Sequence, residues 1–162
     1  MEFKIKKIVS GGQTGADRGG LDAAIAVGLP HGGWCPQGRL AEDGKIPEIY
    51  NQDELYSRFY AHRTEQNVID SDATVVFTYG SPEGGSRRTV EFAVKHDKPY
   101  LWVDMNNENS VAAAEVIEWL KKMRNLQIIL NVAGSRESSN NGLQERVCAV
   151  IKSVLLSQDS TF

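Results

Sequence analysis

Short apolar runs alternate along the chain with segments in which apolar residues recur at helical spacing. The clearest run, residues 73–77, is a continuous apolar stretch bounded by Asp72 and Gly80, which is typical of a strand buried in a parallel sheet. Three further runs have the same character. The predicted strands therefore cover residues 5–9, 73–77, 100–103 and 128–132.

Helical spacing of apolar residues predicts a helix after each of these strands, and one short additional helix. The first helix is expected to stop at Gly28. The short one, residues 64–69, is expected to be capped by Thr64. The helices that follow strands carry their apolar residues within 21–25, 90–94, 113–120 and 143–154.

The order of these elements predicts the fold class. Residues 31–60 are rich in glycine, proline and aromatic residues and show no long element. Around this segment the order is strand-helix, then helix-strand-helix-strand-helix-strand-helix. Such alternation is typical of a mainly parallel sheet with helices on both faces. We therefore expect a three-layer, Rossmann-like α/β fold, forming a single domain over residues 1–162 because no repeat or linker interrupts it.

Composition and charge exclude several classes of protein. The net charge of −3 offers no general attraction to nucleic acid or to an anionic membrane surface. No stretch approaches the ~20 apolar residues of a membrane span, and the apolar run at the N-terminus is too short for a signal peptide. The chain has 2 cysteines without CxxC spacing, and its histidines lack metal-ligand spacing. We expect a cytoplasmic protein without a metal site.

Three glycine-rich loops follow predicted strands and precede helical segments, at residues 11–18, 80–89 and 133–138. Glycine lets the backbone approach an anion, and the helix N-terminus supplies unpaired N–H groups and a favourable dipole. Hydroxyl and arginine side chains in these loops add donors and positive charge. The residues predicted to bind a ligand are Gly11, Gly12, Gln13, Thr14, Gly15, Asp17, Arg18, Gly84, Gly85, Ser86, Arg87 and Thr89.

The first loop matches neither the Walker pattern nor GxGxxG, so P-loop hydrolysis and standard dinucleotide binding lose support. In the second loop, Arg87 and Arg88 occupy consecutive helical positions and point about 100° apart. We expect one of them to reach the ligand and the other to lie at the surface. Glu91 either complements the helix dipole or acts as a general acid or base facing the site.

Several strings resemble one bacterial family, the molybdenum cofactor carrier proteins, which are circularly permuted relatives of the YpsA group. They are SGGQTGADRGGLDAA, HGGWCPQGRLAEDGKIP, RTEQNVIDSDATVV, GGSRRTVEFA and KPYLWVD, and they span nearly the whole chain. The wider Rossmann-like superfamily includes the lysine decarboxylase-like phosphoribohydrolases, and many of its members are dimers or tetramers. The resemblance also aligns Gly84, Gly85, Thr89 and Glu91 with the PGGxGTxxE loop of those enzymes. Here three residues, Ser86, Arg87 and Arg88, separate Gly85 from Thr89, where those enzymes have two residues of which the second is a glycine.

The resemblance implies a homo-oligomeric carrier that binds a phosphorylated small molecule, with the molybdenum cofactor (molybdopterin) as the named candidate. Its pterin would lie against an aromatic side chain such as Trp34, and its phosphate in the glycine loops. Two alternatives stay open. One is a phosphoribohydrolase that cleaves an N-glycosidic bond in a nucleotide, with Glu91 as the catalytic carboxylate. The other is a nucleotide-sensing module, which would use the same site residues as the carrier.

Overall fold

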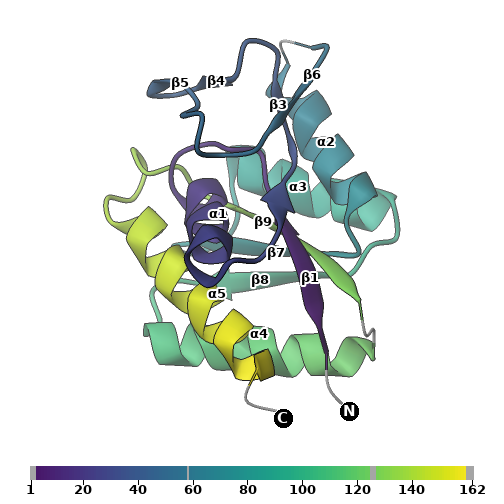
Figure 1. Cartoon of the computed structure of the whole chain (residues 1–162), viewed down its shortest axis with the longest axis vertical. Helices are drawn as coiled ribbons and strands as arrows, with labels where there is room; N and C mark the ends of the chain where they lie inside the picture. The colour runs from purple at the N-terminus through teal and green to yellow at the C-terminus, as the bar shows by residue number, and fades with distance from the viewer. Residues whose placement is uncertain (1–2, 58, 125–126, 160–162) are drawn as a thin grey trace.

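The computed structural model describes residues 3–57, 59–124 and 127–159, and a parallel sheet forms its centre (Figure 1). In the described part of the chain the sheet has five strands, in the order β2-β1-β9-β7-β8. Every pairing between neighbouring strands is parallel, as predicted. The strands are β1 (Ile5–Val9), β2 (His31–Gly32), β7 (Ala73–Thr78), β8 (Tyr100–Asp104) and β9 (Ile128–Gly134).

Helices cover both faces of the sheet. On one face, α1 (Ala16–Val27) and α4 (Asn109–Met123) pack against α5 (Leu143–Asp159). On the other face, α2 (Tyr60–Asp70) packs against α3 (Gly84–Lys95). The three-layer α/β Rossmann-like fold predicted from the sequence is thereby confirmed.

The core lies on both sides of β7, in which all six residues are buried. Val75 of this strand pairs with Leu101 on one side and with Val132 on the other. Leu21 and Ile151 bring fully buried apolar side chains from α1 and α5. Removing these side chains from water is the main favourable contribution to folding. The same packing fixes the strand ends, and with them the loops that follow.

The described residues between α1 and α2 form only short strands, in agreement with the absence of a long element in the sequence of this segment. β3 (Trp34–Pro36) pairs with β6 (Asp53–Leu55), and β4 (Leu40–Ala41) forms a hairpin with β5 (Gly44–Lys45). The sequence missed β2, the edge strand of the main sheet, because two residues carry no periodicity. In Figure 1 this segment lies at one end of the molecule and the two termini lie at the other.

Two helix boundaries test the sequence analysis. The stop at Gly28 is confirmed, because this residue has a left-handed φ of 74° and its N–H donates to the carbonyls of Ala24 and Ile25. The expected cap at Thr64 is wrong: α2 begins at Tyr60, and the Thr64 hydroxyl donates to the Tyr60 carbonyl at 2.9 Å inside the helix. A local pattern could not show this earlier start, because tertiary contacts hold the first turn.

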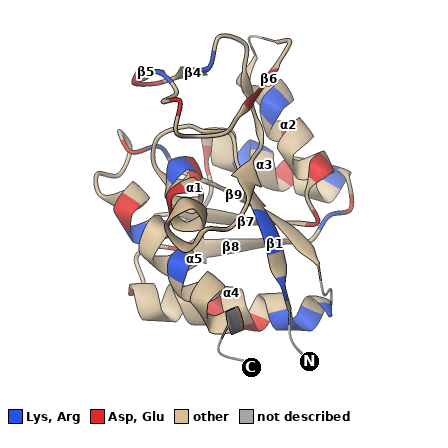
Figure 2. Ribbon diagram, in the orientation of Figure 1, with Lys and Arg blue, Asp and Glu red and all other residues tan. Residues whose placement is uncertain are grey.

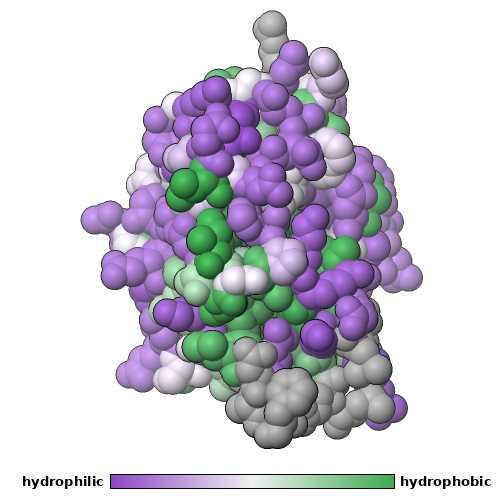
Figure 3. Space-filling model, viewed as in Figure 1, coloured by the Kyte–Doolittle hydropathy of each residue, from purple (hydrophilic) through white to green (hydrophobic). Residues whose placement is uncertain are grey.

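Charged and apolar side chains are distributed unevenly over the surface. Figure 2 shows basic residues on β1 and near the end of α4. They include Lys6 and Lys7 of β1 and Lys121 and Lys122 of α4. The face drawn in Figure 3 carries apolar side chains over α1 and α5, where Ile25 and Leu156 are exposed. Among the described residues, no helix is long and apolar enough to cross a membrane.

Candidate functional site

A cavity of about 700 Å³ lies at the edge of the sheet where the strands end. It is lined by the loops after β1, β7 and β9 and by one side of α2. Ligands of open α/β sheets bind at this edge, and small-molecule sites typically have volumes of ~300–1,000 Å³. The position and the size of the cavity are therefore those of a small-molecule site.

The first glycine loop is closed by hydrogen bonds within the protein. Every backbone amide from Gly12 to Ala16 donates to a protein acceptor, at distances between 3.1 and 3.4 Å. In chain order the acceptors are Ser10 Oγ, Asp17 Oδ2, Gln13 Oε1, Gln144 Oε1 and the Ser135 carbonyl. The sequence predicted an anion at this helix start, yet the amides of residues 12–16 are already used.

Gly15 explains how the loop comes so close to the segment after β9. Its φ of 83° is a left-handed conformation that glycine adopts without strain. A side chain at this position would also lie 2.7 Å from the Glu137 amide nitrogen. This glycine therefore serves contact between two protein loops, whereas the sequence analysis assigned it to contact with a ligand.

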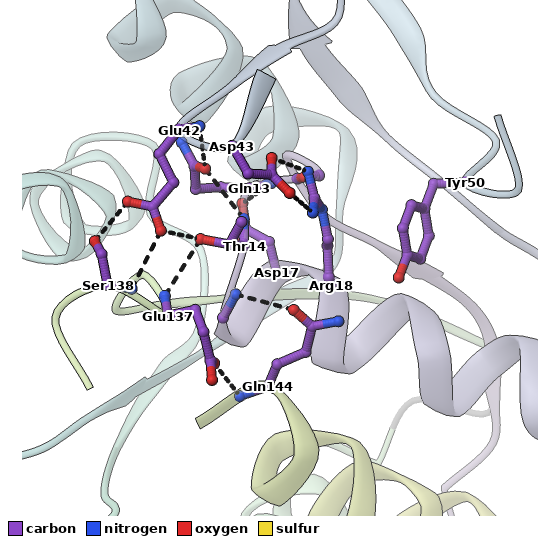
Figure 4. A network of polar contacts seen from close by, with 12 residues as sticks. Gln13, Thr14, Asp17, Arg18, Glu42, Asp43, Tyr50, Glu137, Ser138 and Gln144 are labelled. Carbon is purple, nitrogen blue, oxygen red and sulfur yellow. Dashed lines mark hydrogen bonds and ion pairs between the residues drawn. The ribbon is translucent and has the colours of Figure 1, made fainter. Parts of the chain in front are cut away.

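The predicted residues of the first loop divide into two groups. Gly11, Gln13 and Asp17 line the cavity, while Gly12, Thr14, Gly15 and Arg18 are not part of its wall. The Arg18 guanidinium forms two hydrogen bonds with Asp43, at 2.6 and 2.8 Å, and one with the Gly12 carbonyl, at 2.9 Å (Figure 4). Arg18 thus anchors the β4–β5 hairpin to the loop.

Arg63 of α2 is the main contribution to the cavity that the sequence analysis missed. Its guanidinium lies over Gly11, and its Nη1 is 3.1 Å from Asp17 Oδ2. Both side chains are largely buried, with 12% and 7% exposed. Burial raises the pKa of the Asp17 carboxyl, and the positive charge of Arg63 opposes that shift. Within the described residues, Arg63 Nε is buried without a hydrogen-bond partner.

The start of α3 is the glycine-rich helix start that faces the cavity. Gly84, Gly85, Ser86 and Thr89 all line it, together with Arg88. No side chain caps this helix, so its first amides are available to an anion. All the predicted residues of this loop except Arg87 therefore lie where the sequence analysis expected them.

Arg87 and Arg88 point in different directions, as the helical spacing predicted. Arg88 lines the cavity, whereas the Arg87 side chain is 75% exposed and lies 3.5 Å from Glu91. Glu91 is itself 65% exposed and is not part of the cavity wall. An acid or base role for Glu91 inside the cavity has no support in this geometry.

The loop after β9 supplies the third part of the wall. Arg136 lies over the ring of Tyr60 with its Cζ 5.5 Å from the ring centroid, and Arg63 contacts the same ring at 5.8 Å. Tyr60 and Tyr79 are the aromatic residues of the lining. Trp34, which the sequence analysis placed against a pterin, is instead hydrogen-bonded to Asp70 at 2.7 Å outside the cavity.

The cavity wall carries more positive than negative charge. Its charged lining residues are three arginines, Arg63, Arg88 and Arg136, and two carboxylates, Asp17 and Glu83. Within the described residues, Arg88 and Arg136 form no ion pair with a carboxylate. The protein as a whole is acidic, so this cavity is a local site of attraction for anions.

Comparison with known proteins identifies the family. A model of the circularly permutated YpsA SLOG family matches residues 8–155. The chain therefore belongs to the circularly permutated YpsA SLOG family.

One solved structure shares the fold over nearly its whole length. A crystal structure of a "Putative molybdenum carrier protein" from Syntrophus aciditrophicus superposes with a TM-score of 0.90 at 39% sequence identity. The match covers 96% of this chain and 98% of that protein. A search of curated proteins found no match. The family and this relative support a carrier or binding role in general terms.

Proposed function

We propose that this protein binds a phosphorylated small molecule in the cavity and carries it to a partner. The observation that carries the proposal is that, in the described part of the chain, the three arginines of the cavity wall have guanidinium donors without a protein acceptor. Arg88 and Arg136 form no ion pair with a carboxylate among the described residues, and Arg63 has a buried Nε without an acceptor. A phosphate group supplies the acceptors that these guanidinium groups lack.

The phosphate would lie against the first turn of α3. The amides of Gly84 and Gly85 precede the first hydrogen bond of the helix, and Ser86 adds a hydroxyl group in the wall. The dipole of α3 adds to the charge of Arg88, which lies one turn further along the same helix. The alternative position at α1 has no unused amide between Gly12 and Ala16.

The molybdenum cofactor is the first candidate for the ligand. The relative with 39% identity is named for molybdenum, and a cavity of about 700 Å³ has room for a pterin with its phosphate. Amide side chains that suit the polar edge of a pterin come from Asn131 and Asn140. The described lining contains no cysteine or histidine, so the protein would hold the pterin and the phosphate and leave the metal unligated.

A nucleotide would satisfy the same phosphate contacts, and the sensing alternative is therefore distinguished only by the ligand. The hydrolase alternative needs a carboxylate at the ribose. Glu91 is outside the cavity, and Asp17 is held in an ion pair with Arg63. Glu83, at the start of α3, is the remaining carboxylate of the wall. The carboxylate that the hydrolase alternative assigned, Glu91, is therefore not in place, and a hydrolase would have to use Glu83 instead.

Native mass spectrometry of freshly purified protein tests this proposal. We expect a mass excess over the polypeptide that disappears on denaturation, with a released compound that contains phosphorus. A pterin in that compound supports the molybdenum cofactor, and a purine or pyrimidine supports the sensing alternative. Protein that is free of ligand and that also fails to bind added molybdopterin, AMP or phosphate would refute the proposal.

A further inference from the structure

A carboxylate of the β4–β5 hairpin reaches across to the loop that carries Arg136. Glu42 Oε1 accepts hydrogen bonds from the Thr14 hydroxyl and, at 3.2 Å, from the Ser138 amide. Its other oxygen accepts the Ser138 hydroxyl at 2.5 Å (Figure 4). The Glu42 amide donates to Gln13 Oε1 at 2.9 Å. Glu42 thus joins three segments that lie far apart in the sequence.

The loop after β9 is held by few other contacts between Arg136 and Gly142. The Glu137 amide donates to the Thr14 hydroxyl at 3.3 Å, and the Glu137 carboxylate accepts from the amides of Gly142 and Gln144 at the start of α5. The Arg136 carbonyl accepts the Ser139 amide at 3.2 Å, but its guanidinium has no hydrogen bond or ion pair among the described residues and contacts the Tyr60 ring. Ser135 anchors the backbone before Arg136 through hydrogen bonds with Phe77 and Ala16. The position of the guanidinium therefore depends, on the other side, on the backbone at residues 137 and 138.

We infer that Glu42 is a positioning residue for the cavity, because its bonds to Ser138 and Thr14 hold the loop that places Arg136 against Tyr60. The benefit to a ligand rests on the proposed function, since Arg136 is one of the guanidinium groups assigned to the phosphate. The hairpin itself contributes no residue to the cavity wall. Its role is to fix the loop from outside.

The sign of the change in anion affinity on neutralising Glu42 distinguishes a positioning role from a purely electrostatic one. The negative charge of Glu42 lies close enough to Arg136 for the two charges to interact. Removing that charge alone would leave the wall more positive and would strengthen the binding of an anion. Releasing the loop would weaken binding because Arg136 would no longer be fixed. A neutral variant that binds an anion less tightly therefore reports on position and not on charge.

The experiment compares inorganic phosphate binding by Glu42→Gln, Ser138→Ala and the wild type, using calorimetric titration. We expect an affinity loss of about three- to tenfold in each variant, because each removes part of a charge-assisted contact. The matched control is Glu48→Gln, which removes the same charge from an exposed side chain of the same segment. It should leave the affinity unchanged or slightly higher. Equal or tighter binding by Glu42→Gln would overturn the inference.

An Arg136→Ala background tests whether Glu42 acts through Arg136. In that background Glu42→Gln should cause no further loss, because the group it positions is gone. A loss that persists would show that Glu42 acts on the cavity by another route and would also overturn the inference. Ser138→Ala removes only a hydroxyl group, so it provides the comparison if Glu42→Gln fails to fold.

Hydrogen exchange without ligand separates this inference from the proposed function. The Ser138 amide should exchange on the order of tenfold faster in Glu42→Gln than in the wild type, because it loses its charged acceptor. Unchanged exchange would refute the positioning role. Wild-type protein that binds no phosphate, with faster Ser138 exchange in the variant, would refute the proposed function and leave the role of Glu42 in the loop supported.

Discussion

The guanidinium of Arg63 occupies the space that a side chain at Gly11 would fill. An added Cβ at Gly11 would overlap Arg63 Nη1, and it would lie 3.0 Å from Nε. The two residues come from different elements, β1 and its loop on one side and α2 on the other. The glycine therefore allows a buried arginine to lie flat against the backbone, with Asp17 beside it and the cavity in front.

Gly11→Ala should displace Arg63 and both destabilise the protein and weaken phosphate binding. Overpacking a closed site typically costs about 1–3 kcal/mol. Urea denaturation measures the loss, and titration with phosphate measures the affinity. Gly85→Ala is the control for stability, because an added Cβ there has no atom within 4 Å. A Gly11→Ala protein with wild-type stability and affinity would contradict the close packing of Arg63.

Arg88→Ala and Arg87→Ala should have unequal effects on phosphate affinity. Loss of a guanidinium that contacts an anion typically costs a factor of about ten or more. An exposed ion pair contributes little, so Arg87→Ala should change the affinity by less than about twofold. Isothermal calorimetry measures both variants. Equal losses would mean that both side chains reach the ligand and that the start of α3 is misplaced.

Arg18→Ala should act on stability and not on the ligand. This side chain is 6% exposed and is bonded to Asp43 and to the Gly12 carbonyl, outside the cavity wall. Breaking these bonds should lower the free energy of unfolding by about 1–3 kcal/mol. The phosphate affinity of the folded variant should stay within about twofold of the wild type. An Arg18→Ala variant with unchanged stability and reduced phosphate affinity would show instead that Arg18 contacts the ligand.

The carboxylates of the β4–β5 hairpin predict a loss of stability in acid. Burial would raise the pKa of Glu42, but hydrogen bonds from Ser138 and Thr14 outweigh it and hold the pKa below the ordinary value of 4.5. Hydrogen bonds from Arg18 lower the pKa of Asp43 from its ordinary value of 3.8. A carboxylate whose pKa is lower in the folded state stabilises the fold above its unfolded pKa, and this contribution disappears as the pH falls through the folded pKa.

The melting temperature should therefore depend little on these two groups above about pH 5 and fall as the solution becomes more acidic. The double variant with Glu42→Gln and Asp43→Asn should be less stable than the wild type at neutral pH and should lose less on acidification. Differential scanning calorimetry over a series of pH values measures both curves. Parallel curves for the two proteins would contradict the lowered pKa of these carboxylates.

The sequence predicted the sheet well because its signals are local. The apolar run at residues 73–77 is buried in the structure, and Gly28 ends its helix by a backbone conformation that its own residue type favours. The start of α2 was missed because the turn before Thr64 carries no apolar periodicity. It is held by contacts of Tyr60 with Arg136 and of Arg63 with Asp17, which are distant in the chain. Such contacts have no local pattern.

The candidate site was predicted in part for the same reason. The glycines at the start of α3 line the cavity, and glycine before a helix is a local signal. The first loop also has glycine before a helix, but its amides are not available to a ligand. Gln144 and Ser135, from the far end of the chain, accept hydrogen bonds from the amides of Gly15 and Ala16. Arg63 was missed because a single arginine on a polar helix carries no pattern until the fold brings it over Gly11.

Backbone amide shifts during a phosphate titration test the central claim most directly. The account predicts that NMR signals of Gly84 and Gly85 shift with saturation, because their amides receive the anion at the start of α3. The amides of residues 12–16 already have protein acceptors and should move little. Saturable shifts confined to residues 12–16, or no saturable shift at Gly84 and Gly85, would contradict an anion site at α3.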